Sequence, residues 1–266
     1  MSLFQAVIIA IIEGITEFLP ISSTAHMKFA NPLIGVSPGA FADLFEIVIQ
    51  LAAILAVVVL YYKQFFDFKK VGFYIKLVIA LIPAIVAGVL LKKHIDAALG
   101  NIEFIAVVMI VGGIILLFID RLFTRPRIHS QDSVTYKNAF IIGCYQVLSV
   151  LFPGLSRSAA TIIGGLSRSL DRRTAAEFSF FLAVPTMLAA SVKSAWDVHK
   201  TNPEVFARDS MVLLAVGSLV AFVVALLAIR FFITYLQRHG FRIFGYYRIL
   251  AGSLILFLVW KGVIHT

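Results

Sequence analysis

Charged residues and cysteine are both scarce in this sequence. Only 14% of its 266 residues are charged, against about 25% in soluble domains, and the mean hydropathy is +0.98. Too little polar surface is left to cover a water-soluble globule, so lipid must be the solvent. The single cysteine, Cys144, excludes an intrachain disulfide and a cysteine metal cluster, and we expect it to be a small buried packing residue.

The few charges that are present are mostly basic, with a net charge of +9. In polytopic membrane proteins, basic residues collect in cytoplasmic loops and near anionic lipid headgroups. The charge therefore predicts contact with membrane lipids and no nucleic-acid partner. A homodimer is compatible with the sequence, which does not decide the oligomeric state.

Apolar runs predict an all-α polytopic membrane protein formed by one domain, residues 1–266. Six runs are long enough to span a bilayer, and they lie at Phe41–Tyr62, Val71–Leu91, Ile102–Ile119, Ala175–Trp196, Met211–Leu236 and Ile243–Ile264. Basic residues follow the first, third and fifth runs and precede the fourth. If the six spans alternate, these connections share one side of the membrane, which the positive-inside rule makes cytoplasmic.

Two further regions, residues 2–35 and 138–170, do not fit simple spans. Each begins apolar, breaks at a proline (Pro20 or Pro153), passes through hydroxyl residues and becomes apolar again. A broken backbone at membrane depth is tolerated only where protein or a polar cavity satisfies its hydrogen bonds. We therefore predict two re-entrant helix–loop–helix hairpins in addition to the six spans.

The two broken regions indicate an internal repeat. Pro153 lies 133 residues after Pro20, and Phe178 lies 133 residues after Phe45; 133 is half of 266. The repeats would cover about 1–133 and 134–266, each with one hairpin and three spans. Because three is odd, the second repeat would enter the membrane upside down, and such inverted-topology repeats form their sites near the midplane.

The first broken region carries candidate catalytic residues. Glu13 and Glu17 are four apart, so both carboxylates lie on one helix face. Inside an apolar region they need a divalent cation, a shared proton or a nearby arginine; the alternative is a helix end that faces water. Carboxylates with hydroxyl and water oxygens suit Mg²⁺ or Ca²⁺. The sequence therefore predicts a metal site at Glu13 and Glu17.

His26 is the histidine of this region, and it lies three residues after Ser23. If a helix resumes at Ser23 or Thr24, the imidazole can reach a serine hydroxyl, which is a nucleophile arrangement. His26 itself, or water activated by a glutamate, is an alternative nucleophile. A core histidine that bonds a backbone carbonyl is the structural alternative.

The second broken region predicts a phosphate-binding turn. Pro153 and Gly154 break the helix, and Ser156 or Ser158 can cap the next one. A new helix N-terminus offers free N–H groups to phosphate, and Arg157 can add charge-assisted hydrogen bonds. The alternative is that Arg157 is only a structural partner for one of the glutamates.

Other polar residues give weaker signals. Glu46 and Gln50 share a face of the first span and could line a cavity, as could Glu177 from the second half. Three basic residues within apolar runs are expected near the membrane interfaces, where their side chains snorkel to water; these are Lys193, Arg230 and Arg248.

Several motifs together resemble the undecaprenyl pyrophosphate phosphatase family, also called the bacitracin-resistance protein family. They are EG-TEFLP-SST-H at Glu13–His26, FE-VIQL at Phe45–Leu51, PG-SRS--T at Pro153–Thr161, EFSF-LAVP at Glu177–Pro185 and YR at Tyr247–Arg248. The resemblance covers essentially the whole chain. Ala25 departs from it, because many members carry glycine there, and we expect only a small packing change.

The resemblance implies that undecaprenyl pyrophosphate is hydrolysed to undecaprenyl phosphate and inorganic phosphate. This activity recycles the lipid carrier of cell-wall synthesis and confers bacitracin resistance. It further implies a divalent cation and a bacterial inner-membrane location with a site that opens toward the outer face. The residues implied as essential are Glu13, Glu17, Ser23, His26 and Arg157; those implied to support phosphate binding are Ser22, Thr24, Ser156, Ser158 and Thr161.

Two other function classes share features with this sequence. The type 2 phosphatidic-acid phosphatase superfamily requires a histidine six residues after the arginine of its Ser-Arg motif; here that position is Ile163, so this assignment fails. A lipid-phosphate transporter or flippase is the alternative from another class, since inverted repeats with broken helices are typical of transporters.

Overall fold

The computed structural model describes residues 1–202, 205 and 208–264. Six of its helices are long and apolar enough to cross a membrane. They are α3 (Ala40–Leu60), α5 (Val71–Leu90), α7 (Ile102–Leu122), α10 (Arg172–Thr201), α11 (Arg208–His239) and α12 (Arg242–Trp260). The six predicted spans are thus confirmed as helices by length and composition. In the described ranges no strand forms, only one isolated bridge between Ile128 and Leu170.

The ends of the spans differ from the predicted limits where polar residues continue a helix. The fourth span was expected to begin at Ala175, but α10 begins at Arg172 because the Asp171 side chain accepts a hydrogen bond from the Thr174 N–H at 2.7 Å. This is an ordinary N-cap. A hydropathy pattern does not show this helix start, because the first helical turn of α10 contains two arginines.

Short helices occupy the two broken regions. α1 (Leu3–Thr16) and α2 (Ser23–Leu33) form the first, and α8 (Tyr136–Leu151) and α9 (Arg157–Ser167) form the second. The 14 residues of α1 are about 21 Å long at 1.5 Å per residue, less than the roughly 30 Å of a bilayer core. Two other short helices, α4 (Tyr62–Phe65) and α6 (Lys92–Leu99), lie in connections.

Each broken region turns between its two helices, at residues 17–23 (the first turn) and 152–157 (the second turn), and both turns have the same unusual backbone conformation at a serine. Ser22 and Ser156 have positive φ values of 72° and 76°, which are unusual for a residue with a Cβ atom. Each hydroxyl accepts a hydrogen bond from the N–H three residues on, at 3.3 Å to Ala25 and 3.3 Å to Ala159. The N-cap bond therefore holds each serine in the conformation from which α2 or α9 begins.

Each long helix of the two broken regions packs against a spanning helix of the other half of the chain. α1 lies against α11 and α8 lies against α5, while α7 pairs with α12 and α3 with α10. Glycines allow the first two crossings: a Cβ on Gly14 would lie 2.8 Å from the Ala221 carbonyl oxygen, and one on Gly143 would lie 2.2 Å from that of Ala80. Such close contacts of backbones are typical of helices in membranes.

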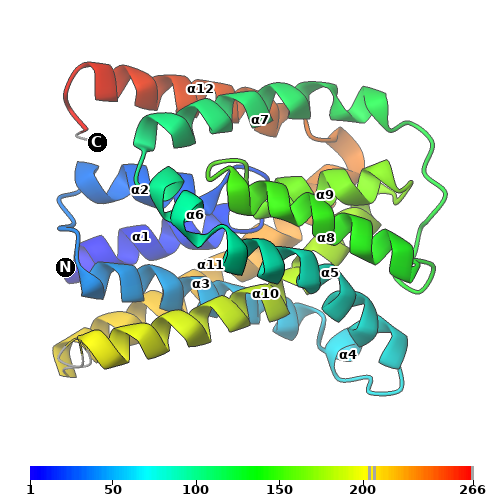
Figure 1. The fold of residues 1–266 in the computed structure, drawn as a ribbon, viewed down its shortest axis with the longest axis horizontal. Coiled ribbons are helices and arrows are strands. Elements are labelled where there is room, and N and C mark those ends of the chain that lie inside the picture. The colour runs from blue at the N-terminus through cyan, green and yellow to red at the C-terminus, as the bar shows by residue number, and fades with distance from the viewer. Residues whose placement is uncertain (203–204, 206–207, 265–266) are drawn as a thin grey trace.

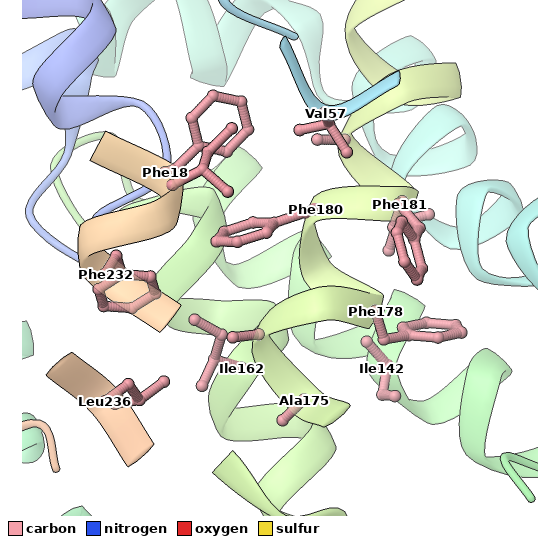
Figure 2. Packing of buried hydrophobic residues seen from close by; sticks show 14 of the residues in the cluster. Phe18, Val57, Ile142, Ile162, Ala175, Phe178, Phe180, Phe181, Phe232 and Leu236 are labelled. Atoms are coloured by element: carbon pink, nitrogen blue, oxygen red, sulfur yellow. The ribbon is translucent and has the colours of Figure 1, made fainter. Parts of the chain in front are cut away.

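Aromatic side chains form the centre of the core. Figure 2 shows Phe18, from the first turn, directed toward Phe180 of α10, and their ring centroids are 5.1 Å apart in an edge-to-face arrangement. Phe180 also lies 6.0 Å from Phe232 of α11. Phe18 thus packs the first turn against α10, and Phe180 in turn contacts α11.

Apolar side chains also cover the outside of the molecule. Leu227 and Leu250 are 63% and 72% exposed in α11 and α12, as expected of faces that contact lipid. Cys144 is exposed as well, so our expectation of a buried packing residue was wrong. It lies on the outer face of α8, where lipid rather than protein would surround it.

Both termini lie at one end of the bundle (Figure 1). α4 and the long connection between α7 and α8 lie at the opposite end, together with basic residues such as Lys63 and Arg125. The expected alternation of the spans is consistent with this arrangement.

Candidate active site

The two turns meet around a cavity of about 270 Å³. The first turn and α2 contribute four lining residues, and the second turn and α9 contribute four more: Glu17, Ser22, Ser23 and Thr24, then Pro153, Gly154, Ser156 and Arg157. Gln50 of α3 completes the polar wall, and Ile95 and Leu99 of α6 supply an apolar one. Polar residues from both halves of the chain therefore converge in one cavity.

A buried network of three side chains joins the halves at this cavity. The Arg157 Nη2 donates to Glu17 Oε1 at 3.0 Å, and the side chains of Arg157 and Glu17 are only 13% and 6% exposed. The Ser23 hydroxyl donates to Glu17 Oε2 at 2.6 Å. Glu17 is thus hydrogen-bonded at both oxygens, which stabilises its charge and places a proton acceptor beside the Ser23 oxygen.

The Arg157 guanidinium is held at both of its terminal nitrogens. Its Nη2 donates to Glu17 and its Nη1 donates to the Ser179 carbonyl at 3.0 Å, while its buried Nε has no partner in the described part of the chain. Because Arg157 lines the cavity, its positive charge is suited to an anionic ligand there.

We expected His26 to reach the Ser23 hydroxyl, but it does not contact Ser23. Its Nδ1 lies 2.7 Å from the Ser22 carbonyl oxygen and its Nε2 lies 2.7 Å from the Tyr247 hydroxyl, and its ring stacks on that of Tyr247. A carbonyl oxygen only accepts, so Nδ1 carries the hydrogen and Nε2 accepts from Tyr247. Both nitrogens are therefore engaged away from Ser23, because α12 lies beside this face of α2.

Glu13 lies behind Glu17, away from the cavity wall. It is completely buried, and the one side chain within hydrogen-bonding reach of its carboxyl, among the described residues, is that of Glu17. Glu46 and Arg157 also act on it electrostatically. Two adjacent buried carboxyl groups can share a proton or hold a hard cation, although the described residues include no cluster of three or more His, Cys, Asp or Glu side chains.

Ser158 and Thr161, which we expected to bind phosphate, lie behind the cavity and brace it. The Ser158 hydroxyl donates to the Leu19 carbonyl at 2.9 Å, which joins the second turn to the first. The Thr161 hydroxyl is within hydrogen-bond distance of the Arg157 carbonyl at 2.9 Å and the Ser179 hydroxyl at 2.6 Å. Because Ser158 uses its proton for Leu19, Ser156 is the donor in the 2.9 Å contact between these two serines.

Three weaker expectations had different outcomes. Gln50 lines the cavity. Glu46 instead accepts a hydrogen bond of 2.5 Å from Asn31. Glu177 does not reach the cavity: it pairs with Arg173 at 2.8 Å, four residues earlier on the same helix.

Arg248 does not lie where we predicted it. We expected it to snorkel, but it is completely buried and donates to four carbonyl oxygens, those of Pro20, Met109, Gly154 and Leu155, at 2.8–3.1 Å. The other two basic residues of that group are exposed. The sequence feature that could have indicated this burial is the pair of glycines at 112–113 in α7. They leave room for the guanidinium, since a Cβ on Gly112 would lie 2.3 Å from Arg248 Nη2.

The chain is similar to known proteins over nearly its whole length. The family model for the bacitracin resistance protein BacA matches residues 6–254. The undecaprenyl-diphosphatase of Flavobacterium psychrophilum is 51% identical over 97% of this chain and 96% of its own length. Undecaprenyl-diphosphatases of Porphyromonas gingivalis, at 46% with 99% of both chains covered, and of Bdellovibrio bacteriovorus, at 44% with 98% of both chains covered, are similar throughout as well.

Proposed function

Since the chain belongs to the bacitracin resistance protein BacA family, we infer that it is an undecaprenyl-diphosphatase. It is a multi-pass membrane hydrolase that acts on a polyprenyl diphosphate lipid, an activity tied to cell-wall synthesis and bacitracin resistance. The observation that carries the chemistry is the Ser23–Glu17–Arg157 network at a cavity shared by both turns.

We propose Ser23 as the nucleophile and Glu17 as its base. The Ser23 oxygen attacks the terminal phosphorus while its proton passes to Glu17, and the bond from phosphorus to the bridging oxygen breaks, so undecaprenyl phosphate leaves. Water then cleaves the phosphoserine, which releases inorganic phosphate and restores the Ser23 hydroxyl. The 2.6 Å hydrogen bond between Ser23 and Glu17 favours this pair over Ser23 and His26, whose nitrogens are engaged elsewhere.

Arg157 binds the phosphoryl oxygens in this proposal. Arg157 lines the cavity and is held in place by Glu17 and the Ser179 carbonyl, and charge that develops on the transferred group is stabilised most where the cation is already in place. We further propose Mg²⁺ or Ca²⁺ at Glu13 and Glu17, where a bound cation would neutralise negative charge on the diphosphate.

The two broken regions are proposed as re-entrant hairpins of an inverted repeat. The arguments are the short helices, the matching positive-φ serines and the corresponding packing of α1 on α11 and α8 on α5. We also propose an inner-membrane location with the basic end in the cytoplasm. The cavity would then open outward, since α6, which forms its apolar wall, joins α5 to α7 at the other side.

An apolar cavity of about 260 Å³ is proposed to hold part of the polyprenyl chain. It lies on the other side of the first turn and is lined by residues such as Leu19, Ile21, Phe244 and Tyr247. The first turn thus presents catalytic groups on one face and apolar side chains on the other.

The test is phosphate release from farnesyl or undecaprenyl diphosphate by the purified protein in detergent. The wild type should release phosphate, and Ser23→Ala and Arg157→Ala should each lower kcat by about 10²-fold or more. Ser167→Ala is the matched control, because this hydroxyl only donates to the Gly164 carbonyl of its own helix. A phosphoenzyme that still forms in Ser23→Ala would refute serine as the nucleophile.

A further inference from the structure

Arg248 is a buried cation whose hydrogen bonds all go to backbone. Its Nη1 donates to the carbonyls of Pro20 at 3.0 Å and Leu155 at 2.8 Å, and its Nη2 donates to that of Gly154 at 2.8 Å. Its Nε donates to Met109 at 3.1 Å in α7. Four of the five guanidinium N–H groups are thus used, and three of them reach the two turns.

These bonds set the direction of one particular peptide. All described peptide bonds are trans, so a carbonyl and the next N–H point in opposite directions. Because the Leu155 carbonyl points at Arg248, the Ser156 N–H points away from it. No acceptor for this N–H is found in the described part of the chain, and Ser156 is one of the residues that line the cavity.

We propose that Arg248 is a positioning residue that turns the Leu155–Ser156 peptide so that the Ser156 N–H binds a phosphoryl oxygen of the substrate. The proposal rests on the proposed function. By holding Pro20 and Leu155 through one nitrogen, Arg248 also sets the spacing between the turn that carries Glu17 and the turn that carries Arg157.

Only an arginine in a glycine-lined space fits this role. A lysine is a point charge and cannot span carbonyls that lie around a planar fork. Gly112 leaves room for the guanidinium, since an added Cβ would lie 2.3 Å from Nη2 and 3.0 Å from Cζ. Gly154 has a φ of +97°, and a Cβ there would lie 2.4 Å from the Ile105 carbonyl oxygen.

The experiment compares two variants with two matched controls in steady-state hydrolysis of farnesyl diphosphate. Arg248→Lys keeps the charge but loses the fork, and Gly112→Ala keeps Arg248 but displaces it. The controls are Arg230→Lys on an exposed position of α11 and Gly88→Ala on α5, where an added Cβ meets nothing within 4 Å. Each protein is first checked for wild-type elution and thermal unfolding, and vanadate inhibition is measured as well.

We expect kcat to fall about 10- to 100-fold in Arg248→Lys and Gly112→Ala, in line with the loss of a placed donor. KM should change less than about threefold and inhibition by vanadate, a mimic of the transferred phosphoryl group, should weaken in parallel with kcat. The controls should match the wild type. Inactive wild-type protein would refute the proposed function itself.

Three results would overturn the positioning role alone, with the wild type active. One is wild-type kcat in both variants. Another is a loss of folded protein while kcat and vanadate inhibition per folded molecule stay unchanged, which is the result expected of a purely structural residue. The third is a rise in KM with kcat unchanged.

Discussion

The two turns of this molecule have the same conformation at their capping serine but differ in charge. Ser22 and Ser156 have nearly the same positive φ and cap the next helix with hydrogen bonds of equal length. The residue after the cap is Ser23 in the first turn and Arg157 in the second. One turn therefore brings a hydroxyl beside Glu17, and the other brings a cation.

The difference explains why neither half forms the site alone. Glu17 receives one hydrogen bond from its own turn, by Ser23, and the other from Arg157 across the molecule. A carboxylate buried at membrane depth needs the cation, and the cation needs the carboxylate. Four changes test this comparison, the largest expected effect first.

Breaking the pair between the turns should have the largest effect. Glu17→Gln and Arg157→Gln should each lower kcat by about 10²-fold or more and lower stability by about 3–5 kcal/mol, because each leaves a buried charge without its partner. The double variant should lose clearly less stability than the sum. Thermal unfolding in detergent measures the cycle. The control is the pair Arg173 and Glu177, whose arginine side chain is 60% exposed. A double-mutant cycle on this pair should give a coupling free energy of at most about 1 kcal/mol. Equal coupling free energies in the two cycles would contradict the argument.

The glycines at the close crossings of α1 with α11 and of α8 with α5 should have the next largest effect. Gly143→Ala should destabilise more than Gly14→Ala, since the new Cβ would lie 2.2 Å from a backbone oxygen in the first case and 2.8 Å in the second. Overpacking of this kind costs about 1–3 kcal/mol. Gly88→Ala, on an open face of α5, should not lower the unfolding midpoint, because alanine favours a helix more than glycine does. A larger loss of stability in Gly14→Ala than in Gly143→Ala would argue against rigid helix crossings.

The capping serines should have smaller and unequal effects. Ser22→Ala should cost about 1 kcal/mol through loss of the cap, and Ser156→Ala should cost about 0.5–1.5 kcal/mol more, because this hydroxyl also donates to Ser158. Glycine at either position tolerates positive φ, so each serine-to-glycine variant should be more stable than its alanine counterpart. Unfolding midpoints of the four variants check the ranking.

The smallest effect concerns Asp171, the N-cap residue of α10. Burial alone would raise the pKa of Asp171, but hydrogen bonds from Thr174 and His129 outweigh it and lower this pKa. A carboxylate with a lowered folded-state pKa stabilises the fold above its ordinary pKa of about 4, and the contribution is lost as pH falls through the lowered value. Between about pH 5 and 2, the wild type should therefore lose slightly more stability than Asp171→Asn, measured by unfolding at each pH. Identical pH profiles would contradict this.

Much of the fold and part of the site could be predicted from local patterns. The six spans follow from apolar length, and the breaks follow from Pro20 and Pro153 with their hydroxyl residues. Arg157 stood out because an arginine at membrane depth requires an anionic partner. Each of these conclusions depends on neighbours in the chain or on the solvent.

The wrong expectations concern contacts between distant segments. His26 was expected to bond Ser23, three residues away, but its Nε2 meets Tyr247 of α12. Arg248 was expected near an interface, whereas the two turns and α7 enclose it.

The sequence by itself determined the solvent, the number of spans, the two broken regions and the residue types that chemistry requires. These follow from hydropathy and from the conformations that proline and serine caps allow locally. Only the tertiary structure decided which base lies beside Ser23, which arginine meets a carboxylate and which one organises the backbone. The reason is that a side chain's hydrogen bonds in a buried site depend on which helices pack around it, and that packing joins residues more than a hundred positions apart.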